Sequence, residues 1–308
     1  MPVSISAIGK HFSNQCKHEA YEAQDYLSLM ELFFIVLLAI FVATFSVMAG
    51  LGGGVLMVPL LALGTDYPFS LVAGSVLISL TVPALIGSFG AFRRGEIDFR
   101  LAALFEIPTA IGAVLGAHLS VGLDEGLLKL LFASIAALLA REMLRKSNLD
   151  DDALPVQSLF WKRIGEFPPF LHLEKRGARY RISLPSLIGG GLIIGLLSGM
   201  FGVGGGWLKT PLLVIAFGVP PVIASGTAIF MILFTALIGG SAHYLAGNFD
   251  PNLTFSLVVG LGLGSIIGNW LKPRLRTQTL TKVIVFVLFM VSLALLINGI
   301  SLIIRSLQ

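Results

Sequence analysis

Two glycine-rich stretches are the residues of this sequence best suited to bind a ligand. Residues 50–54 read Gly-Leu-Gly-Gly-Gly, and residues 202–206 read Gly-Val-Gly-Gly-Gly. Each stretch runs into an apolar segment that is expected to be a helix. The free backbone N–H groups of the stretch would then lie at the start of that helix, where the positive end of the helix dipole also lies. Such a helix start attracts anions. We therefore predict an anion site whose backbone donors come from Gly52, Gly53, Gly54, Gly204, Gly205 and Gly206.

Glycines also let membrane helices pack closely, and this is the alternative explanation of the triplets. Packing requires one small residue per helical turn and does not explain three in succession, so we favour a helix break at the triplets. The spacing of Gly112 and Gly116, repeated at Gly264 and Gly268, is typical of packing instead. Because alanine still permits close packing, the sequence predicts that Gly116→Ala is mild.

A lysine follows the second triplet. Lys209 stands where the first stretch has Met57, and a lysine inside a membrane span costs about 2.5–3.5 kcal/mol on insertion scales. It needs a partner, which a bound anion would provide. The alternatives are an ion pair with Glu106 or a side chain that reaches the membrane surface. The hydroxyls of Ser75 and Thr227, at matching places in the two halves, could contact oxyanion oxygens or bond to their own helix carbonyls.

Two further ionisable residues are candidates for carrying protons. Glu106 lies in the middle of the apolar segment 101–119, where it could relay protons, pair with Lys209 or lie near the interface. His243 lies near the end of an apolar segment, where histidine is more often an interface residue than a proton carrier.

The composition is that of an integral membrane protein. Hydrophobic residues make up 56% of the chain and charged residues only 12%, about half the usual charged share. The single cysteine, Cys16, excludes a disulfide within the chain and any site with several cysteine ligands. No Walker A sequence occurs, and neither a strand nor an acidic residue is placed as a dinucleotide-binding motif requires. We expect no enzyme activity, no cofactor, no metal and no nucleic-acid partner.

The chain is internally duplicated. Adding 152 to residues 50–61 gives residues 202–213, and eight of the twelve aligned residues are identical. Each half is expected to hold five helical elements, the second of them too short to cross about 30 Å of hydrocarbon. The expected fold is all-α, with elements at 32–49, 55–63, 70–92, 99–119 and 124–140, and again at 184–201, 207–217, 222–244, 251–271 and 281–304. The organisation predicted is a polar tail (1–30), a first repeat (31–140), a basic and aromatic linker (141–183) and a second repeat (184–305).

The distribution of basic residues predicts how the two halves are oriented, because Lys and Arg mark the cytoplasmic side. The linker holds nine of the 21 Lys and Arg residues, and the loop with Arg93 and Arg94 is also basic. The loop equivalent to the Arg93 loop, at 246–250, has no basic residue. Conversely, the loop at 272–276 has three basic residues, whereas its equivalent at 120–124 has none. Equivalent loops are thus predicted to lie on opposite sides of the membrane. We expect two inverted repeats, a cytoplasmic linker and both chain ends outside.

The glycine stretches carry a family resemblance. Their form, Gly-x-Gly-Gly-Gly-x-x-x-x-Pro followed by a patch of small residues, resembles the TauE/SafE family of sulfite exporters. The patches are Ala73-Gly74-Ser75 and Ser225-Gly226-Thr227. The resemblance covers nearly all of residues 31–304 except the linker, whose length departs from the family pattern. It implies a permease that moves sulfite, sulfoacetate or related organosulfonates across bacterial inner membranes.

The sequence and the resemblance together predict a secondary transporter, acting as an exporter, for a small sulfur-containing oxyanion such as sulfite. Alternating access around the two helix breaks is the expected mechanism. One alternative is the same scaffold carrying an organosulfonate or a small carboxylate, and another is an anion channel. The expected partners are the anion, membrane lipid and protons for coupling; the oligomeric state is left open.

Overall fold

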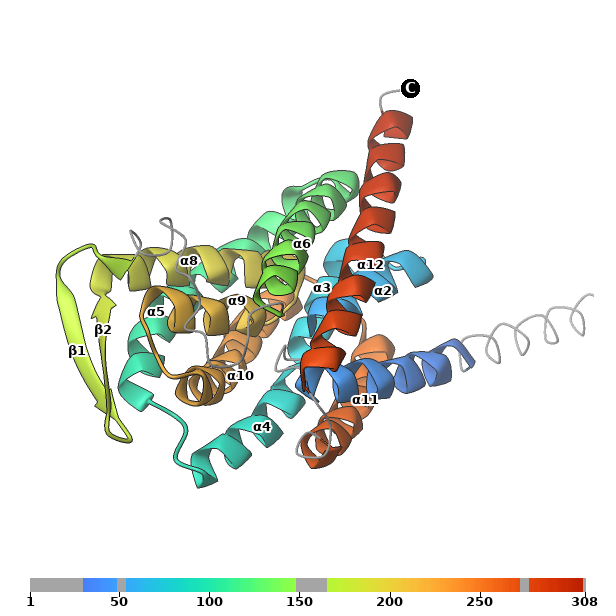
Figure 1. The fold of residues 1–308 in the computed structure, drawn as a ribbon. Coiled ribbons are helices and arrows are strands. Elements are labelled where there is room, and N and C mark those ends of the chain that lie inside the picture. Colours follow the sequence, from blue (N-terminus) through green and yellow to red (C-terminus); the bar gives the residue numbers. More distant parts are fainter. Residues whose placement is uncertain (1–29, 49–53, 148–164, 272–276, 307–308) are drawn as a thin grey trace, which may run out of the picture.

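The structure is a computed structural model that describes residues 30–48, 54–147, 165–271 and 277–306 (Figure 1). Within these ranges, seven helices are long and apolar enough to cross a membrane. They are Met30–Met48, Phe69–Arg93, Phe99–Gly122, Leu184–Phe201, Pro221–Leu245, Pro251–Leu271 and Phe286–Ile304. The mainly helical architecture predicted from the composition is confirmed for this part of the chain. The Cys16 segment and the basic loop at 272–276 lie outside the described residues.

The first half contains the N-terminal span Met30–Met48 followed by five labelled helices. These are α2 (Gly54–Gly64), α3 (Phe69–Ser79), α4 (Thr81–Arg93), α5 (Phe99–Gly122) and α6 (Glu125–Ser147). Helices α3 and α4 follow each other with only Leu80 between them. The apolar segment predicted at 70–92 is therefore a pair of abutting helices.

The second half repeats this order. Its helices are α8 (Leu184–Phe201), α9 (Gly206–Pro211), the π-helix η1 (Leu212–Ala216), α10 (Pro221–Leu245), α11 (Pro251–Leu271) and α12 (Thr277–Ser306). Gly202, Gly204 and Gly205 have φ angles of 72°, 70° and 70°, in the left-handed region that side chains disfavour. Gly202 caps the end of α8 and Gly205 caps the start of α9. Glycine is thus required where the chain leaves one helix and begins the next.

A β-hairpin precedes α8 and was missed by the expectation of a purely helical fold. Strands β1 (Phe170–Lys175) and β2 (Ala178–Ser183) pair antiparallel, with Phe170 opposite Ser183. Their apolar side chains face the start of α5, where Leu173, Tyr180 and Ile182 share a core cluster with Leu101. The hairpin stands at one edge of the molecule, away from α12 (Figure 1).

Tyr180 fixes the hairpin to the helical body. Its phenol donates a hydrogen bond to Oδ2 of Asp98, whose Oδ1 accepts the backbone N–H groups of Arg100 and Leu101 at the start of α5. Burial and the neighbouring Asp98 carboxylate raise the pKa of Tyr180 well above its usual value, so the phenol keeps its proton. The last residues of the linker are therefore an ordered part of the fold.

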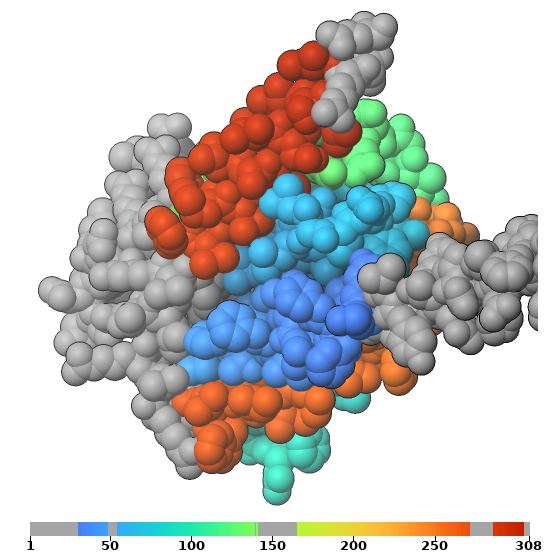
Figure 2. Space-filling model, turned by 90° about the vertical axis from the view of Figure 1, so that its right-hand side faces the viewer, coloured from blue at the N-terminus to red at the C-terminus, as the bar shows by residue number. Residues whose placement is uncertain are grey.

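The two halves are joined by helices whose backbones lie in direct contact. A Cβ added to Gly112 or Gly116 of α5 would lie 2.3 or 2.1 Å from the carbonyl oxygen of Leu192 or Leu196 of α8. The equivalent Gly264 and Gly268 of α11 lie in the same way against the carbonyls of the N-terminal span, which runs beside α11 on the face drawn in Figure 2. Their partners are Ile40 and Thr44, which the 152-residue offset relates to Leu192 and Leu196.

A second set of contacts between the halves is also reciprocal. The backbone N–H of Asp98 donates to the hydroxyl of Thr227 at 3.0 Å, and the N–H of the equivalent Asp250 donates to the equivalent Ser75 at 3.2 Å. Each half therefore supplies a loop that docks on a helix of the other half. The copies exchange equivalent contacts and do not fold as two separate units.

Gly116→Ala is expected to destabilise the protein strongly, contrary to the mild effect that sequence spacing suggests. The added Cβ would meet backbone atoms of α8, which cannot move aside as a flexible side chain can. Gly122→Ala on the same helix is the matched control, because nothing lies within 4 Å of its Cβ position. Thermal unfolding of both variants in detergent checks this. Equal melting temperatures would contradict the close contact of α5 with α8.

Candidate functional site

Gly54, the last residue of the first glycine stretch, lies beside the second stretch. A Cβ on Gly54 would lie 2.7 Å from Leu80 and 3.2 Å from the carbonyl oxygen of Val203 in the other stretch. A Cβ on Gly204 would lie 2.9 Å from the same Leu80, and one on Gly206 would lie 2.3 Å from Ile232, the repeat-equivalent of Leu80. Gly54, Gly204 and Gly206 are therefore close together. Gly52 and Gly53 lie outside the described residues.

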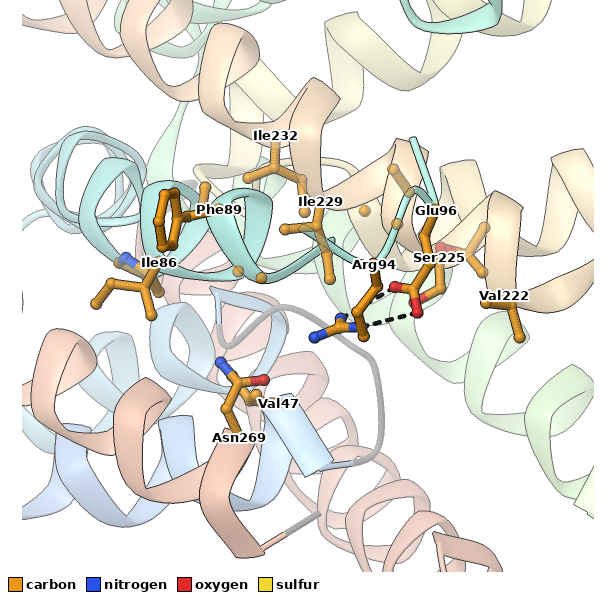
Figure 3. A pocket seen from close by; sticks show the side chains of 18 of the residues that line it. Val47, Ile86, Phe89, Arg94, Glu96, Val222, Ser225, Ile229, Ile232 and Asn269 are labelled. Carbon is orange, nitrogen blue, oxygen red and sulfur yellow. Dashed lines mark hydrogen bonds and ion pairs between the residues drawn. The ribbon is translucent and has the colours of Figure 1, made fainter. Parts of the chain in front are cut away.

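A cavity of about 820 Å³ leads to this place. Gly206 and Thr210 line it together with Leu80 and Ile232, and Val47 of the N-terminal span contributes to its wall. Most of the remaining lining is apolar and comes from α4 and α10 (Figure 3). One wall of the cavity thus reaches the start of α9, where the second glycine stretch ends.

The charged part of the cavity is formed where α4 ends. Arg94 makes a forked ion pair with Glu96, with Nε 2.8 Å from Oε1 and Nη2 3.0 Å from Oε2 (Figure 3). The Arg94 side chain is 61% exposed, and Ser225 and Asn269 line the cavity as well. The Arg93 guanidinium lies over the Phe89 ring, 5.5 Å from its centroid. These groups give the cavity a basic, solvent-accessible end.

A buried polar triad joins α9 to α5 and α10. The ammonium of Lys209 is 2.7 Å from Oε2 of Glu106 on α5 and donates to the hydroxyl of Thr235 on α10, also at 2.7 Å. Thr235 in turn lies 2.5 Å from Oε1 of Glu106 and 3.1 Å from the carbonyl of Met231. Lys209 and Thr235 are fully buried and Glu106 nearly so. Of the alternatives that the sequence left open for Lys209, the structure has the ion pair with Glu106.

Each member of the triad has an apolar residue at its repeat-equivalent position. The offset relates Lys209 to Met57 and Thr235 to Pro83, and the counterpart of Glu106 is Val258. Sequence reasoning missed Thr235 because a threonine in an apolar helix usually bonds to its own backbone. Its alignment with a proline in the repeat was the signal that could have identified it. The triad, with Glu106 from the first half and Lys209 and Thr235 from the second, therefore departs from the symmetry of the repeat.

The other predicted residues lie at contacts between helices. Ser75 and Thr227 accept the reciprocal backbone bonds described above, and Thr227 follows two cavity-lining residues, Ser225 and Gly226. His243 is fully buried, with its Nε2 2.6 Å from the carbonyl oxygen of Gly199, and a Cβ on Gly74 would lie 3.0 Å from it. Since a carbonyl only accepts, Nε2 bears a proton. His243 thus joins α10 to α8 from a buried position.

The comparisons with known proteins agree on the class of protein. Residues 35–295 match a family described as "Sulfite exporter TauE/SafE". The "Probable membrane transporter protein YunE" of Bacillus subtilis is 24% identical over 280 residues, covering 88% of this chain and 99% of that protein. A "Probable membrane transporter protein" of Haemophilus influenzae is 28% identical over 84% of this chain and 95% of its own length.

A plant protein matches over a shorter region. The "Sulfite exporter TauE/SafE family protein 5" of Arabidopsis thaliana is 37% identical over 100 residues, which is 32% of this chain and 21% of the plant protein. No solved structure matches the chain. The bacterial relatives and the seven apolar helices together make this a multi-pass membrane protein.

The triad yields a test of its energetics. Lys209→Met leaves the Glu106 carboxylate buried without its cation, which we expect to lower the free energy of unfolding by about 3–5 kcal/mol. Adding Glu106→Gln removes the unpaired charge and should recover most of the loss. Chemical unfolding of the single and double variants in detergent measures both effects.

Lys129→Met is the control for this test. Lys129 pairs with Glu125 at 2.9 Å, but that carboxylate is 43% exposed and stays solvated when the lysine is removed. The Lys129 variant should therefore lose much less stability. A similar loss in both lysine variants, or no recovery in the double variant, would show that the triad is not a coupled unit.

Proposed function

Because the chain belongs to the sulfite exporter TauE/SafE family, we propose that it is a secondary transporter that exports a small sulfur-containing oxyanion such as sulfite. In this proposal the protein lies in the bacterial inner membrane and works by alternating access around its two glycine stretches. The names of the plant relatives support sulfite as the substrate class. The names of the bacterial relatives support transport without specifying a substrate.

One observation carries the proposal: Gly54, the last residue of the first glycine stretch, lies beside the second stretch at the end of a cavity. A Cβ on Gly54 would lie 3.2 Å from the carbonyl oxygen of Val203, and Gly206 lines the cavity wall. Glycine backbone leaves its N–H groups open to a ligand, and the positive end of a helix dipole favours an anion by about 0.3–1 kcal/mol when exposed and up to about 2 when sheltered. The other end of the cavity carries two guanidinium groups, those of Arg93 and Arg94, against the one carboxylate of Glu96, and this excess of positive charge favours the same ligand.

Lys209 is proposed to take part in binding while it remains paired. A protonated lysine has three N–H donors, and Glu106 and Thr235 accept two of them. The third donor is available to an anion beside Gly205, since a Cβ on that glycine would lie 3.5 Å from Cε of Lys209. Glu106 is proposed as the group that couples transport to protons, because a proton on its carboxylate would free the ammonium for the substrate. His243 is a second candidate for this role.

The transport mechanism requires two halves that can move against each other, and we propose that they are inverted repeats. The reciprocal contacts support this, because Asp98 docks on Thr227 as Asp250 docks on Ser75. Contacts of this kind are expected when a two-fold axis relates the halves, and an axis in the membrane plane makes the repeats inverted. The linker would then lie in the cytoplasm and both termini outside, as the basic residues predict.

Transport is tested directly in proteoliposomes. Labelled sulfite, thiosulfate, sulfoacetate and acetate are offered with and without a pH gradient. We expect saturable sulfite uptake that responds to the gradient. Preference for sulfoacetate or acetate would reassign the substrate, and non-saturating conduction in electrical recordings would favour an anion channel.

Gly205→Ala should abolish this uptake while the protein remains folded in the membrane. The φ of 70° at Gly205 disfavours a side chain, and the added methyl group would lie beside Ser198 and Lys209. Gly247→Ala is the control, because its φ of 75° imposes the same strain but nothing lies within 4 Å. Uptake is compared at matched protein levels. Equal loss in both variants would mean that strain alone, and not the position at the break, explains the result.

The inverted arrangement is tested by labelling equivalent loops from each side. Arg94→Cys and Ala246→Cys, related by the 152-residue offset, are each introduced into a Cys16→Ser background. A membrane-impermeant thiol reagent should label them from opposite faces of the membrane. Labelling of both cysteines from one face would rule out inverted repeats.

A further inference from the structure

Two serines of the repeated unit bury their hydroxyls without a hydrogen bond. Ser46 and Ser198 are related by the 152-residue offset, and each lies four residues before the first glycine of its stretch. They are 0% and 1% exposed. Neither Oγ has a hydrogen-bond partner among the residues that the structure describes.

Several other buried serines of the helices are satisfied by their own backbone. Ser88 of α4 also lacks a partner among the described residues, but the offset relates it to Gly240 and not to a second serine. The hydroxyl of Ser79 donates to the carbonyl of Ser75 at 2.7 Å, and that of Ser292 donates to Leu288 at 2.6 Å. This is the ordinary arrangement for serine in a helix. A buried hydroxyl that forgoes it destabilises the fold, because the group loses its water without gaining a partner. Two equivalent helices are destabilised in this way at the same position, which indicates that the unpaired hydroxyl has the same function in both halves.

The surroundings of Ser198 indicate what that purpose is. A Cβ on Gly205, the residue that caps the start of α9, would lie 3.4 Å from Cβ of Ser198 and 3.5 Å from Cε of Lys209. The free hydroxyl therefore lies beside the glycine break and the buried ammonium. Val47, the neighbour of Ser46 on the N-terminal span, lines the cavity that leads to the two breaks.

We propose that the hydroxyls of Ser46 and Ser198 are a repeat-related pair of hydrogen-bond donors to the transported oxyanion, each four residues before its own glycine stretch. This inference rests on the proposed function and deepens it by naming side chains that recognise the substrate. An oxyanion such as sulfite or a sulfonate has several acceptor oxygens, so it can accept hydrogen bonds from more than one donor. The indole Nε1 of Trp207, buried and also without a described partner, is a further donor at the second stretch.

The proposal predicts opposite effects on binding and on stability. Ser46→Ala and Ser198→Ala remove a donor to a charged ligand, so each should weaken binding of sulfite by about 10- to 150-fold. The same substitutions remove an unpaired hydroxyl from the ligand-free protein, so its melting temperature should stay the same or rise. Ser292→Ala, which removes a satisfied hydroxyl of equal burial away from the glycines, should leave sulfite affinity unchanged.

The experiment uses the full-length purified protein and two probes, sulfite and sulfoacetate. Affinity is measured from the shift in melting temperature with ligand concentration and from half-saturating concentrations in proteoliposome uptake. Wild-type affinity in either serine variant overturns the proposed pair, because the hydroxyl of that serine then does not contact the anion. If wild-type protein binds neither probe and transports none of the four anions, the proposed function fails and this inference fails with it. Binding by wild type and both variants alike overturns this inference alone.

Discussion

The structure depends on places where the backbone of one half lies directly against the backbone of the other. These contacts exist only because glycine has no Cβ: Gly116 approaches the carbonyl of Leu196, Gly74 that of Asn248, and Gly202 that of Ala73. Between helices in lipid, burial of apolar surface supplies little attraction, and close packing takes over that role. The glycines therefore hold the two halves together, and the same residue type also makes the break between α8 and α9.

Much of this architecture could be predicted from sequence, because the signals were periodic or repeated. Apolar runs located the helices, and the duplicated glycine triplets identified where the second half breaks between α8 and α9. The pairing of Lys209 with Glu106 was one of three alternatives for a charge that cannot remain alone in a membrane. The distance between packed helices was not predictable. The spacing of Gly112 and Gly116 indicates that α5 packs on another helix, but it does not show that the helices are too close for an alanine side chain.

The hairpin and Thr235 were missed for different reasons. Apolar and polar residues alternate as in a strand around Leu171, Leu173 and Ile182. The alternation covers only two short segments of a charged linker, and the basic residues of that linker favoured its interpretation as a loop. Thr235 looks like any threonine in an apolar helix, and only the positions of Glu106 and Lys209 in space make it a member of a triad. Local pattern identifies an element, whereas a polar network depends on residues far apart in sequence.

The exchange of contacts between the halves has a consequence for how the protein is made. The N-terminal span needs α11, and α5 needs α8, so no half can bury its glycine faces alone. A nascent chain that has been synthesised only as far as α6 exposes Gly112 and Gly116 to lipid until α8 emerges from the ribosome. The hairpin immediately precedes α8 and is anchored at the first turn of α5 by Tyr180. The hairpin therefore holds the start of α8 beside the start of α5, the helix on which α8 packs.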